Sequence, residues 1–572
     1  MRQWDVIVVG SGAAGLTAAR NAREAGAEEV LVLSKGFAGR AGATITSGGG
    51  VSIAGAEVID LGFPGTPDDK VEHFIHDTIR SGSFLSEQHL VAAMAENVAV
   101  EVKALIEQGT RITSTPRAPG HSSGRGVNIS GVEMQKAVLK SATGANVAFR
   151  EDFYAAGLLK REGVVVGVGG LDRRTGETEP IFGKAVVLAT GGTTSNWRLR
   201  TAPEELNGDG HAMALAAGAE LIEMEMLQFL PCCLVAPDMW RGLQFPWILG
   251  PQSGIRAWLL NKYGERFLAR WDADKMELAT RDVVAAAMAT EILEGRGSPN
   301  GGVYISWAHL PRDIIENFPA MSRNVSADWV WEGFQMRLIV DRILAGHAIE
   351  VAPAAHFSIG GVRIDPGCAT AVPGLYAAGE VTGGVHGANR LSGNAGAQML
   401  AQGRLAGRAA AAFAARQPTP DASDDWAELE AAINAPRLRN DGPKPAEVKS
   451  ELETIVERAL SPVRKGGDLD AGLDKLRGVI ADALPRLACR TDEVAFSRDW
   501  SDALECRSAA TIIEATLLSA RAREHSIGAH RRTDAVAVPS RELRHNVVSR
   551  RSGKTTLTRE AVVFSLLEPV GA

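Results

Sequence analysis

Residues 5–15, DVIVVGSGAAG, decide the fold that the sequence predicts. The β-branched run is typical of a buried strand, and the residues that follow it have the composition of a helix ending at glycine and alanine. Because residues 28–35, EEVLVLSK, are strand-like again, a βαβ unit begins the chain. Gly10, Gly12 and Gly15 fit G-x-G-x-x-G at the strand-to-helix junction, where backbone amides can meet a pyrophosphate. We predict a dinucleotide site here rather than a glycine-rich helix end without a ligand.

The end of the second strand departs from the usual NAD pattern. Such sites place an acidic residue there to bind a ribose hydroxyl. In this chain the strand ends in Ser34 and Lys35, which weakens a simple NAD interpretation.

Two later segments repeat the junction between a buried strand and glycine. They are KAVVLATGG, residues 184–192, and VPGLYAAGE, residues 372–380. Three such junctions, spread over nearly 400 residues, indicate one nucleotide domain assembled from distant segments. The helical and tryptophan-containing stretch between the second and third junctions predicts an inserted domain.

The C-terminal third of the chain is predicted to be mainly helical. A linker rich in proline, aspartate and serine precedes it, and apolar residues then recur at spacings of three and four in residues 445–460 and 507–525. This spacing is typical of amphipathic helices packed in a bundle. From about residue 535 the sequence indicates mixed strand and loop.

Composition excludes several classes of partner. The net charge of -7 and the pI near 6.0 provide no basic footprint for nucleic acid or for an anionic membrane. The five cysteines form no CxxC pair and have no histidine at metal-ligand spacing, so we expect no metal, cluster or disulfide framework. No apolar run is long enough for a membrane span or resembles a signal peptide. We therefore expect a cytoplasmic protein without direct membrane insertion.

Residues 386–395, HGANRLSGNA, combine small residues with a histidine and an arginine. One interpretation is an ordinary turn. The other is a backbone folded closely around a ligand, with His386 and Arg390 reaching into it. On the second interpretation, Gly387 and Gly393 are small because a ligand lies against them.

Taken together, the glycine junctions resemble the succinate dehydrogenase/fumarate reductase flavoprotein family, which includes L-aspartate oxidase. The motifs that carry the resemblance, in order, are GSGAAGLTAA, ITSGGGVSIAG, KAVVLATGG, NGDGHAMALAAGAELIEME, NKYGERF, TRDVVAAAMATEILEGRG, HFSIGGVRID, PGLYAAGE and HGANRLSGN. The resemblance extends to ARAREHSIGAHRRTD, although His525 and Ile527 stand where the family usually has Glu and Arg.

The family implies an α/β fold, α+β overall, with a Rossmann-like FAD-binding domain, an inserted capping domain and a C-terminal helical bundle. In this chain, the FAD-binding domain is predicted in two parts, residues 1–234 and 351–420, with the capping domain between them at 235–350. The helical domain is predicted at 425–534 and a tail at 535–572.

The resemblance also implies which residues hold FAD. Ser34 and Lys35 match the family's substitute for the acidic ribose ligand, so their departure from the NAD pattern favours this family. Ala43 stands where membrane-bound relatives attach FAD through a histidine, which predicts non-covalent FAD. The complete set of expected cofactor-binding residues is Gly10, Gly12, Gly15, Ser34, Lys35, Gly191, Glu380 and Asn394.

Three residues match the family's catalytic positions. Arg281 matches the arginine that protonates the substrate carbon, although an arginine that caps its helix or pairs with the adjacent Asp282 is the simpler alternative. His356 and Arg390 match two residues that hold a substrate carboxylate, and a planar guanidinium suits that task. For His386, a structural role and a ligand contact are equally compatible with the sequence.

The family pattern breaks at the second carboxylate site. QFHPT becomes QFLPC, so Leu230 replaces a histidine, and Leu249 aligns with a threonine. RGEGG aligns with SGIRA, which replaces the proton-relay glutamate with Ile255 and the arginine with Ser253, and Arg256 is a candidate for a shifted replacement of that arginine. Because a carboxylate buried against leucines without partners is unfavourable, we expect a substrate with one anionic group whose apolar part lies toward the leucines and Trp247.

The predicted function is hydride transfer between FAD and a CH–CH or C=C bond next to a carboxylate, with a substrate other than succinate or fumarate. Two alternatives stay open: an L-aspartate oxidase-like amino acid oxidase, and a flavin-binding electron-transfer subunit paired with an iron–sulfur protein. The resemblance also leaves open whether the enzyme acts alone or with an iron–sulfur subunit.

Overall fold

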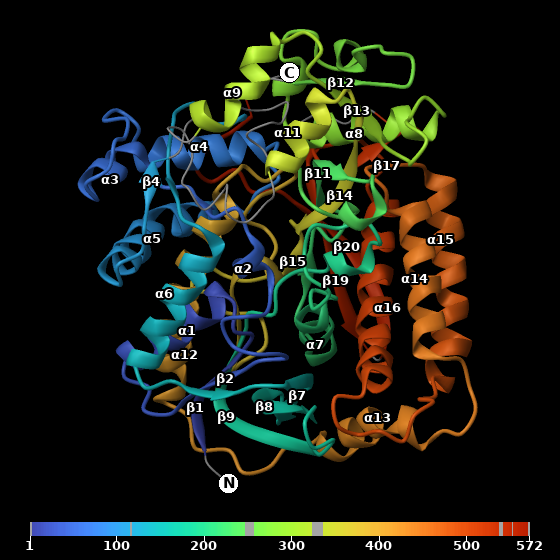
Figure 1. Cartoon of the computed structure of the whole chain (residues 1–572). Coiled ribbons are helices and arrows are strands. Elements are labelled where there is room, and N and C mark those ends of the chain that lie inside the picture. Colours follow the sequence, from blue (N-terminus) through green and yellow to red (C-terminus); the bar gives the residue numbers. More distant parts are fainter. Residues whose placement is uncertain are drawn as a thin grey trace.

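A computed structural model of the chain describes residues 3–114, 117–245, 257–322, 336–536, 542–551 and 553–569. Figure 1 shows a nucleotide-binding part built from the N-terminal and central segments, a cap above it, and a set of long C-terminal helices along one side.

A parallel sheet forms the base of the nucleotide-binding part. Its strands are ordered β6-β2-β1-β9, and β16 also pairs with β9. Val8 of β1 lies opposite Val32 on one side and Val187 on the other. Strands of such a sheet are buried on both faces and are therefore near-continuous apolar runs. This burial explains why residues 6–9 are all apolar. The strands are β1 (Trp4–Val9), β2 (Val30–Leu33), β6 (Ala148–Arg150), β9 (Thr178–Leu188) and β16 (Leu375–Ala377).

The first half of β9 leaves this sheet and pairs with an antiparallel meander, β7 (Phe153–Arg161) and β8 (Val164–Asp172). A small three-stranded sheet lies elsewhere in this part, with strands β3 (Gly50–Val51), β5 (Val127–Asn128) and β4 (Thr113–Ser114).

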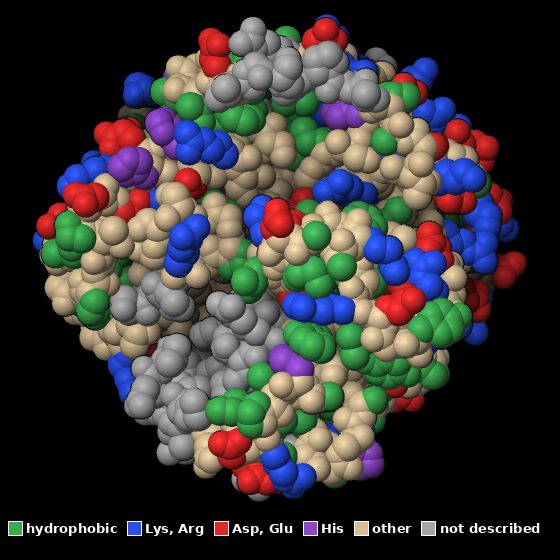
Figure 2. Space-filling view, turned by 90° about the horizontal axis from the view of Figure 1, so that it is seen from above, with side chains coloured by type: hydrophobic (Ala, Val, Ile, Leu, Met, Phe, Trp, Pro, Cys, Tyr) green, Lys and Arg blue, Asp and Glu red, His purple; other side chains and the backbone are tan. Residues whose placement is uncertain are grey.

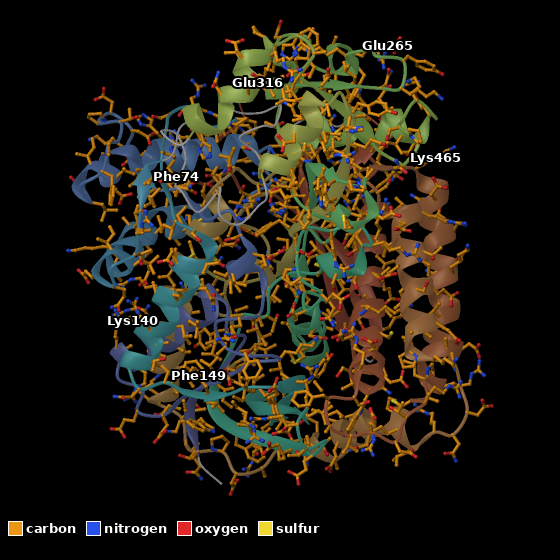
Figure 3. The ribbon with its side chains drawn as sticks, in the orientation of Figure 1. Phe74, Lys140, Phe149, Glu265, Glu316 and Lys465 are labelled. Atoms are coloured by element: carbon orange, nitrogen blue, oxygen red, sulfur yellow. The ribbon has the colours of Figure 1, made fainter. Side chains whose placement is uncertain are left out.

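Helices cover the parallel sheet. α1 packs closely on α12 because two glycines of α12 face it: a Cβ at Gly407 would lie 2.1 Å from the Ala18 carbonyl oxygen. Figure 3 shows Phe74 of α4 inside the molecule, whereas Lys140 of α6 points outward. The helices of this part are α1 (Ala13–Glu24), α2 (Ala43–Thr46), α3 (Gly55–Asp60), α4 (Val71–Ser81), α5 (Gln88–Glu107), α6 (Gly131–Gly144), α7 (Asp209–Ala217) and α12 (Asn394–Ala414).

The cap contains an antiparallel sheet ordered β11-β14-β13-β12. The neighbouring strands β11 and β14 flank the predicted inserted segment 235–350 in the sequence, because β11 ends and β14 begins at its two boundaries. The chain therefore leaves and re-enters the nucleotide-binding part at adjacent strands. The predicted boundaries themselves stay a prediction. The elements are β11 (Leu227–Leu234), β12 (Trp258–Leu260), β13 (Val303–Ser306), β14 (Ile349–Ser358), α8 (Arg281–Leu293), α9 (Arg312–Ser322) and α11 (Met336–Leu344).

The C-terminal part is helical, as predicted. Leu452 and Val456 of α14 belong to one buried cluster with Leu473 of α15 and Leu517 of α16, which accounts for the apolar spacing of three and four. Its elements are α13 (Trp426–Leu438), α14 (Pro445–Ala459), α15 (Gly466–Gly478), α16 (Arg498–Ala522) and the paired short strands β17 (Val463–Arg464) and β18 (Arg531–Arg532).

The tail forms a hairpin, β19 (Arg544–Arg551) and β20 (Lys554–Ala561). β19 pairs with β10 (Leu221–Ile222), which also pairs with β15 (Gly361–Val362). The tail therefore extends a sheet whose other strands come from the central segments of the chain.

Within the described ranges, no helix is long and apolar enough to cross a membrane, and no group of histidine, cysteine and acidic side chains is arranged to hold a metal ion. On the face seen from above the cap, acidic and basic side chains are interspersed (Figure 2).

Candidate active site

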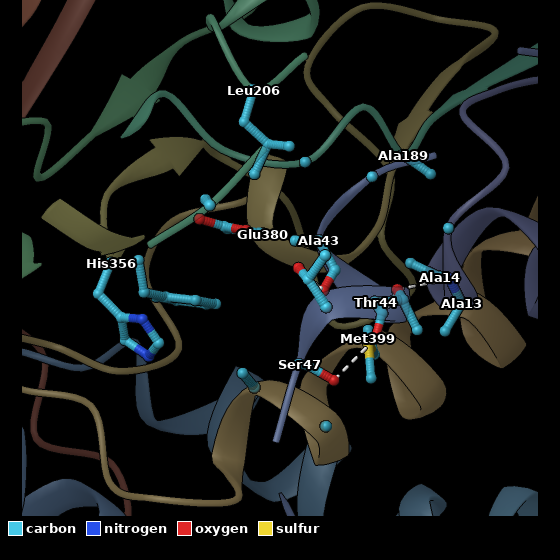
Figure 4. A pocket seen from close by; sticks show the side chains of 18 of the residues that line it. Ala13, Ala14, Ala43, Thr44, Ser47, Ala189, Leu206, His356, Glu380 and Met399 are labelled. Atoms are coloured by element: carbon cyan, nitrogen blue, oxygen red, sulfur yellow. Dashed lines mark hydrogen bonds between the residues drawn. The ribbon is translucent and has the colours of Figure 1, made fainter. Parts of the chain in front are cut away.

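A cavity of about 500 Å³ runs between the nucleotide-binding part and the cap. Figure 4 shows Ala13 and Ala14 of α1 toward one end, His356 toward the other, and Glu380 and Ala43 between them. Most of the predicted site residues line this one cavity: Gly10, Gly12, Ser34, Lys35, Gly191, Arg281, His356, Glu380 and Arg390.

The glycine loop before α1 is shaped by close backbone contacts. Gly10 has a φ of +115°, and a Cβ there would lie 2.2 Å from the Ala189 carbonyl oxygen. A Cβ at Gly15 would lie 2.0 Å from the Gly10 carbonyl oxygen, so this glycine allows the helix to pack on the loop. Gly12, the N-cap of α1, has no capping side chain. The Ala13 N–H donates to the Thr44 hydroxyl at 3.1 Å, and both residues line the cavity, so the positive N-terminal end of the helix lies at the cavity wall.

The Ser-Lys pair at the end of β2 is held by its own neighbours. The hydroxyl oxygens of Ser34 and Ser11 lie 2.7 Å apart. The Lys35 ammonium contacts Asp209 at 3.0 Å and Glu505 of α16 at 2.7 Å. Although burial opposes the charge, these two carboxylates raise the pKa of Lys35 above its ordinary value. The C-terminal helical part thus contacts a residue that lines this end of the cavity.

Glu380 occupies the middle of the cavity. Its Oε1 accepts a hydrogen bond of 3.0 Å from the backbone N–H of Ser358. A Cβ at Gly192 would lie 2.1 Å from the same oxygen, so a side chain there would require the Glu380 carboxylate to move. Burial raises the pKa of Glu380 to about 7, against the opposing effects of the Ser358 hydrogen bond and the Arg390 charge.

Two arginines converge on one amide oxygen at the cap end of the cavity. Gln228 Oε1 accepts hydrogen bonds from Arg281 at 3.1 Å and from Arg390 at 2.6 Å. Gln228 Nε2 donates in turn to the Arg390 carbonyl oxygen at 2.8 Å. The Arg390 guanidinium also lies 4.5 Å from the centre of the Phe357 ring. Among the ion pairs of the described residues, neither guanidinium has a carboxylate partner, although the charge of Glu380 acts on Arg390 from the middle of the cavity. The cap end of the cavity is therefore cationic.

Burial lowers the pKa values of all three groups, and for Arg390 and His356 neighbouring arginine charges add to the effect. Burial lowers the pKa of Arg281 to about 10. Burial, together with the Arg281 charge, holds the pKa of Arg390 well below its usual range. Burial and the two arginines do the same to the pKa of His356, which is therefore neutral at physiological pH. His356 Nδ1 lies 2.7 Å from the Thr201 hydroxyl oxygen. The site can therefore bind an anion while keeping a neutral imidazole beside it.

The segment 386–395 only partly faces the cavity. His386 is buried and does not belong to the described cavity lining, and its Nε2 lies 2.8 Å from Gln398 Oε1. Burial lowers the pKa of His386 to about 3. These observations favour the structural role. Gly387 is small because its Cβ would lie 2.5 Å from the Gly82 carbonyl oxygen, not because a ligand lies there. Gly393 does line the cavity. Asn394, whose amide donates to Thr78 at 3.0 Å, does not belong to the described lining, so its cofactor contact stays a prediction.

The predicted second-carboxylate residues are placed only in part. Leu230 is buried in β11 opposite Ala354 and does not belong to the described lining of the cavity. The other residues of that prediction, Trp247, Leu249, Ser253, Ile255 and Arg256, lie outside the described residues.

Sequence reasoning missed several residues that the fold brings to the site. Gln228 is a polar residue in the otherwise apolar strand LQFLPCCL, and that contrast could have revealed it. Thr201 and Glu505 carry no such signal. Each is far in the sequence from the motif residue that it contacts, which is His356 for Thr201 and Lys35 for Glu505.

Comparisons with known proteins agree with this geometry. A family model described as an FAD binding domain matches residues 5–395, and one described as the fumarate reductase flavoprotein C-terminus matches residues 449–571. The fold and the site thus define an FAD-dependent oxidoreductase. The chain belongs to the succinate dehydrogenase/fumarate reductase flavoprotein family, as its motifs predict.

Relatives cover nearly the whole chain. A subunit of the fumarate reductase (CoM/CoB) of Methanothermobacter marburgensis is 33% identical, over 93% of this chain and 94% of the relative. L-aspartate oxidase of Streptomyces coelicolor is 30% identical, over 97% and 92%. Among solved structures, a quinol-fumarate reductase with menaquinol molecules superposes with a TM-score of 0.86 at 27% identity, covering 100% of this chain and 100% of that one.

Proposed function

We propose that the enzyme acts on a carbon–carbon bond adjacent to a carboxylate, with Arg281, Arg390 and His356 as the residues that bind and protonate the substrate. The observation that supports this most directly is the convergence of both guanidinium groups on Gln228 Oε1, beside a neutral imidazole and without a carboxylate partner among the described residues. Bound FAD supplies the hydride donor or acceptor for such a reaction.

Arg390 and His356 would hold the substrate carboxylate. The planar guanidinium can offer two parallel N–H groups to it, and the neutral imidazole can donate from Nε2 when the Thr201 hydroxyl donates to Nδ1. A carboxylate conjugated with the reacting bond places its charge against these fixed donors, which stabilises the enolate-like charge that forms during the reaction.

Arg281 would move the proton. An arginine normally keeps its proton, but burial without a carboxylate partner among the described residues lowers its pKa to about 10. That shift brings the guanidinium closer to the range in which a general acid operates.

We place fumarate and succinate outside the preferred substrates. The reason is that Leu230, an apolar and buried residue, stands where the family's QFHPT motif has a histidine. A second carboxylate on the substrate would therefore lack its histidine partner. The preferred substrate would carry a single anionic group.

Non-covalent FAD forms part of this proposal. Ala43, at the position of the flavin-linking histidine of membrane-bound relatives, lines the cavity and offers no nucleophile (Figure 4). Acid precipitation of the holoenzyme is expected to release all flavin into the supernatant, whereas flavin remaining in the pellet would contradict it.

Two further arrangements have specific support. The similarity to L-aspartate oxidase over 97% of this chain supports amino acid oxidation as a second candidate function. Pairing with an iron–sulfur electron-transfer subunit is supported by relatives that are named as parts of larger enzymes, such as the 8-methylmenaquinol:fumarate reductase flavoprotein subunit of Wolinella succinogenes.

The test is anaerobic reoxidation of the fully reduced holoenzyme, followed by its visible flavin band. We expect acrylate or crotonate to reoxidise it faster than fumarate. Faster reoxidation by fumarate would contradict the single-carboxylate proposal. Failure of every enoate, combined with reduction of the oxidised enzyme by amino acids, would favour the second candidate.

The Thr201 hydroxyl should control carboxylate affinity. Thr201→Val removes the hydrogen bond that fixes the tautomer of His356, so the dissociation constant of crotonate for the oxidised holoenzyme should rise about tenfold, measured by the change in flavin absorbance. Thr201→Ser keeps the hydroxyl and should bind as the wild type does. Equal binding by the Val variant and the wild type would contradict this role.

A further inference from the structure

Two opposite charges stand side by side at the start of α8. Arg281 is the first residue of the helix and Asp282 the second. If the Asp282 carboxylate turned toward the Arg281 guanidinium, it would stabilise the charged form and raise its pKa. It would also cancel part of the positive charge that attracts a substrate carboxylate.

The structure directs these two side chains to different partners. Arg281 reaches Gln228 in the cap sheet at 3.1 Å. Asp282 Oδ2 instead lies 3.8 Å from Arg531 Nη2, and the Asp282 side chain is only 9% exposed. Arg531 comes from β18, about 250 residues further along the chain.

We propose that Arg531 is a positioning residue that holds the Asp282 carboxylate away from Arg281 and so preserves a cationic site in which neither Arg281 nor Arg390 forms an ion pair with a described residue. The inference rests on the proposed function, because it assigns Arg281 and the anion site the roles given above.

The backbone around Arg531 is fixed by its neighbours. Arg531 pairs with Val463 of β17, and β17 itself contacts α8. Arg464 of β17 donates to the Glu225 carbonyl oxygen at 2.8 Å, and Arg532 of β18 forms an ion pair with Asp534. The C-terminal segment is thus anchored to the cap side of the site.

Within the described residues, Asp282 Oδ1 and Arg531 Nε are buried without a hydrogen-bond partner. Among the ion pairs of the described residues, Arg531 on β18 is the partner of the Asp282 carboxylate, and Arg281 is the cation that precedes Asp282 on its own helix. Removal of the Arg531 charge would leave Arg281 as the nearest cation available to this carboxylate.

The simpler interpretation is an ion pair without functional effect. Arg531 is 33% exposed, and partly exposed pairs contribute little to stability. On that interpretation, its loss would change the melting temperature slightly and would leave the chemistry of Arg281 unchanged.

The experiment compares wild type, Arg531→Gln, Asp282→Asn and the double variant as FAD-loaded enzymes. The first readout is the dissociation constant of crotonate for the oxidised enzyme. The second is the rate at which phenylglyoxal modifies Arg281, measured by peptide mass spectrometry, because this reagent attacks the uncharged guanidine. The matched control is Arg521→Gln on α16, which breaks the exposed ion pair between Arg521 and Asp470 of α15.

We expect Arg531→Gln to weaken crotonate binding and to slow Arg281 modification, each about tenfold, since one pKa unit is a tenfold change in the uncharged fraction. Asp282→Asn alone and the Arg521 control should stay near wild type, and the double variant should regain both properties. Wild-type behaviour of Arg531→Gln, or a loss that persists in the double variant, would overturn the inference. The labelling readout needs no substrate, so an enzyme inactive on every enoate would refute the proposed function while still testing Arg531.

Discussion

Replacement of Arg281 by glutamine is expected to lower the rate of flavin reoxidation by the preferred enoate about a thousandfold, the range found when a general acid or a preorganised cation is removed. The physical reason is that glutamine is a neutral polar side chain that has neither an acidic proton to give nor a charge to place near the substrate carboxylate. FAD content should not change, because Arg281 lies at the cap end of the cavity, away from the glycine loop. Stopped-flow absorbance of the reduced holoenzyme measures the effect.

The control for this variant is Arg312→Gln. Arg312 lies in the same cap, is largely exposed and pairs with Glu316 on the surface, so its replacement should leave the rate unchanged. A loss of less than tenfold for Arg281→Gln would show that another group delivers the proton.

Gly10→Ala should abolish FAD binding. The added Cβ would have to occupy a position 2.2 Å from the Ala189 carbonyl oxygen, at a φ of +115° that side chains rarely adopt. Strain and overpacking together cost about 2–6 kcal/mol, and the loop can escape only by moving away from the pyrophosphate position. We expect purified protein with less than about a tenth of the wild-type flavin, because a tenfold loss corresponds to about 1.4 kcal/mol, which is below the lower end of that range.

Gly26→Ala is the matched control for the backbone strain of an alanine at a positive φ. Gly26 follows α1 with a φ of +100°, but a Cβ there would meet nothing within 4 Å. It should lower the melting temperature slightly and keep the flavin. If both variants retain FAD equally, the close approach at Gly10 does not define the cofactor loop.

Local sequence was sufficient to predict the fold and the cofactor. The run DVIVVG followed by spaced glycines can be accommodated only where a buried strand turns into a helix, and the three strand-to-glycine junctions do meet in one sheet as β1, β9 and β16. The Ser34–Lys35 pair was correctly interpreted as evidence against NAD, because the family to which the chain belongs binds FAD.

Other features could not be predicted, because they depend on which segments meet. His386 and Gly387 sit beside Arg390 in sequence, yet His386 pairs with Gln398 and Gly387 packs on Gly82. The orientation of Asp282 was ambiguous for the same reason, since adjacent opposite charges allow a local pair that a distant Arg531 can prevent.

The sequence by itself determined the family, the FAD-binding fold and the candidates Arg281, His356 and Arg390, because these follow from short motifs with strict steric or chemical requirements. Only the tertiary structure decided that both arginines share Gln228, that Thr201 contacts His356 and that Glu505 reaches Lys35. These contacts join residues 53 to 470 positions apart, and the free energy of such contacts depends on burial and on neighbouring charges that no local pattern encodes.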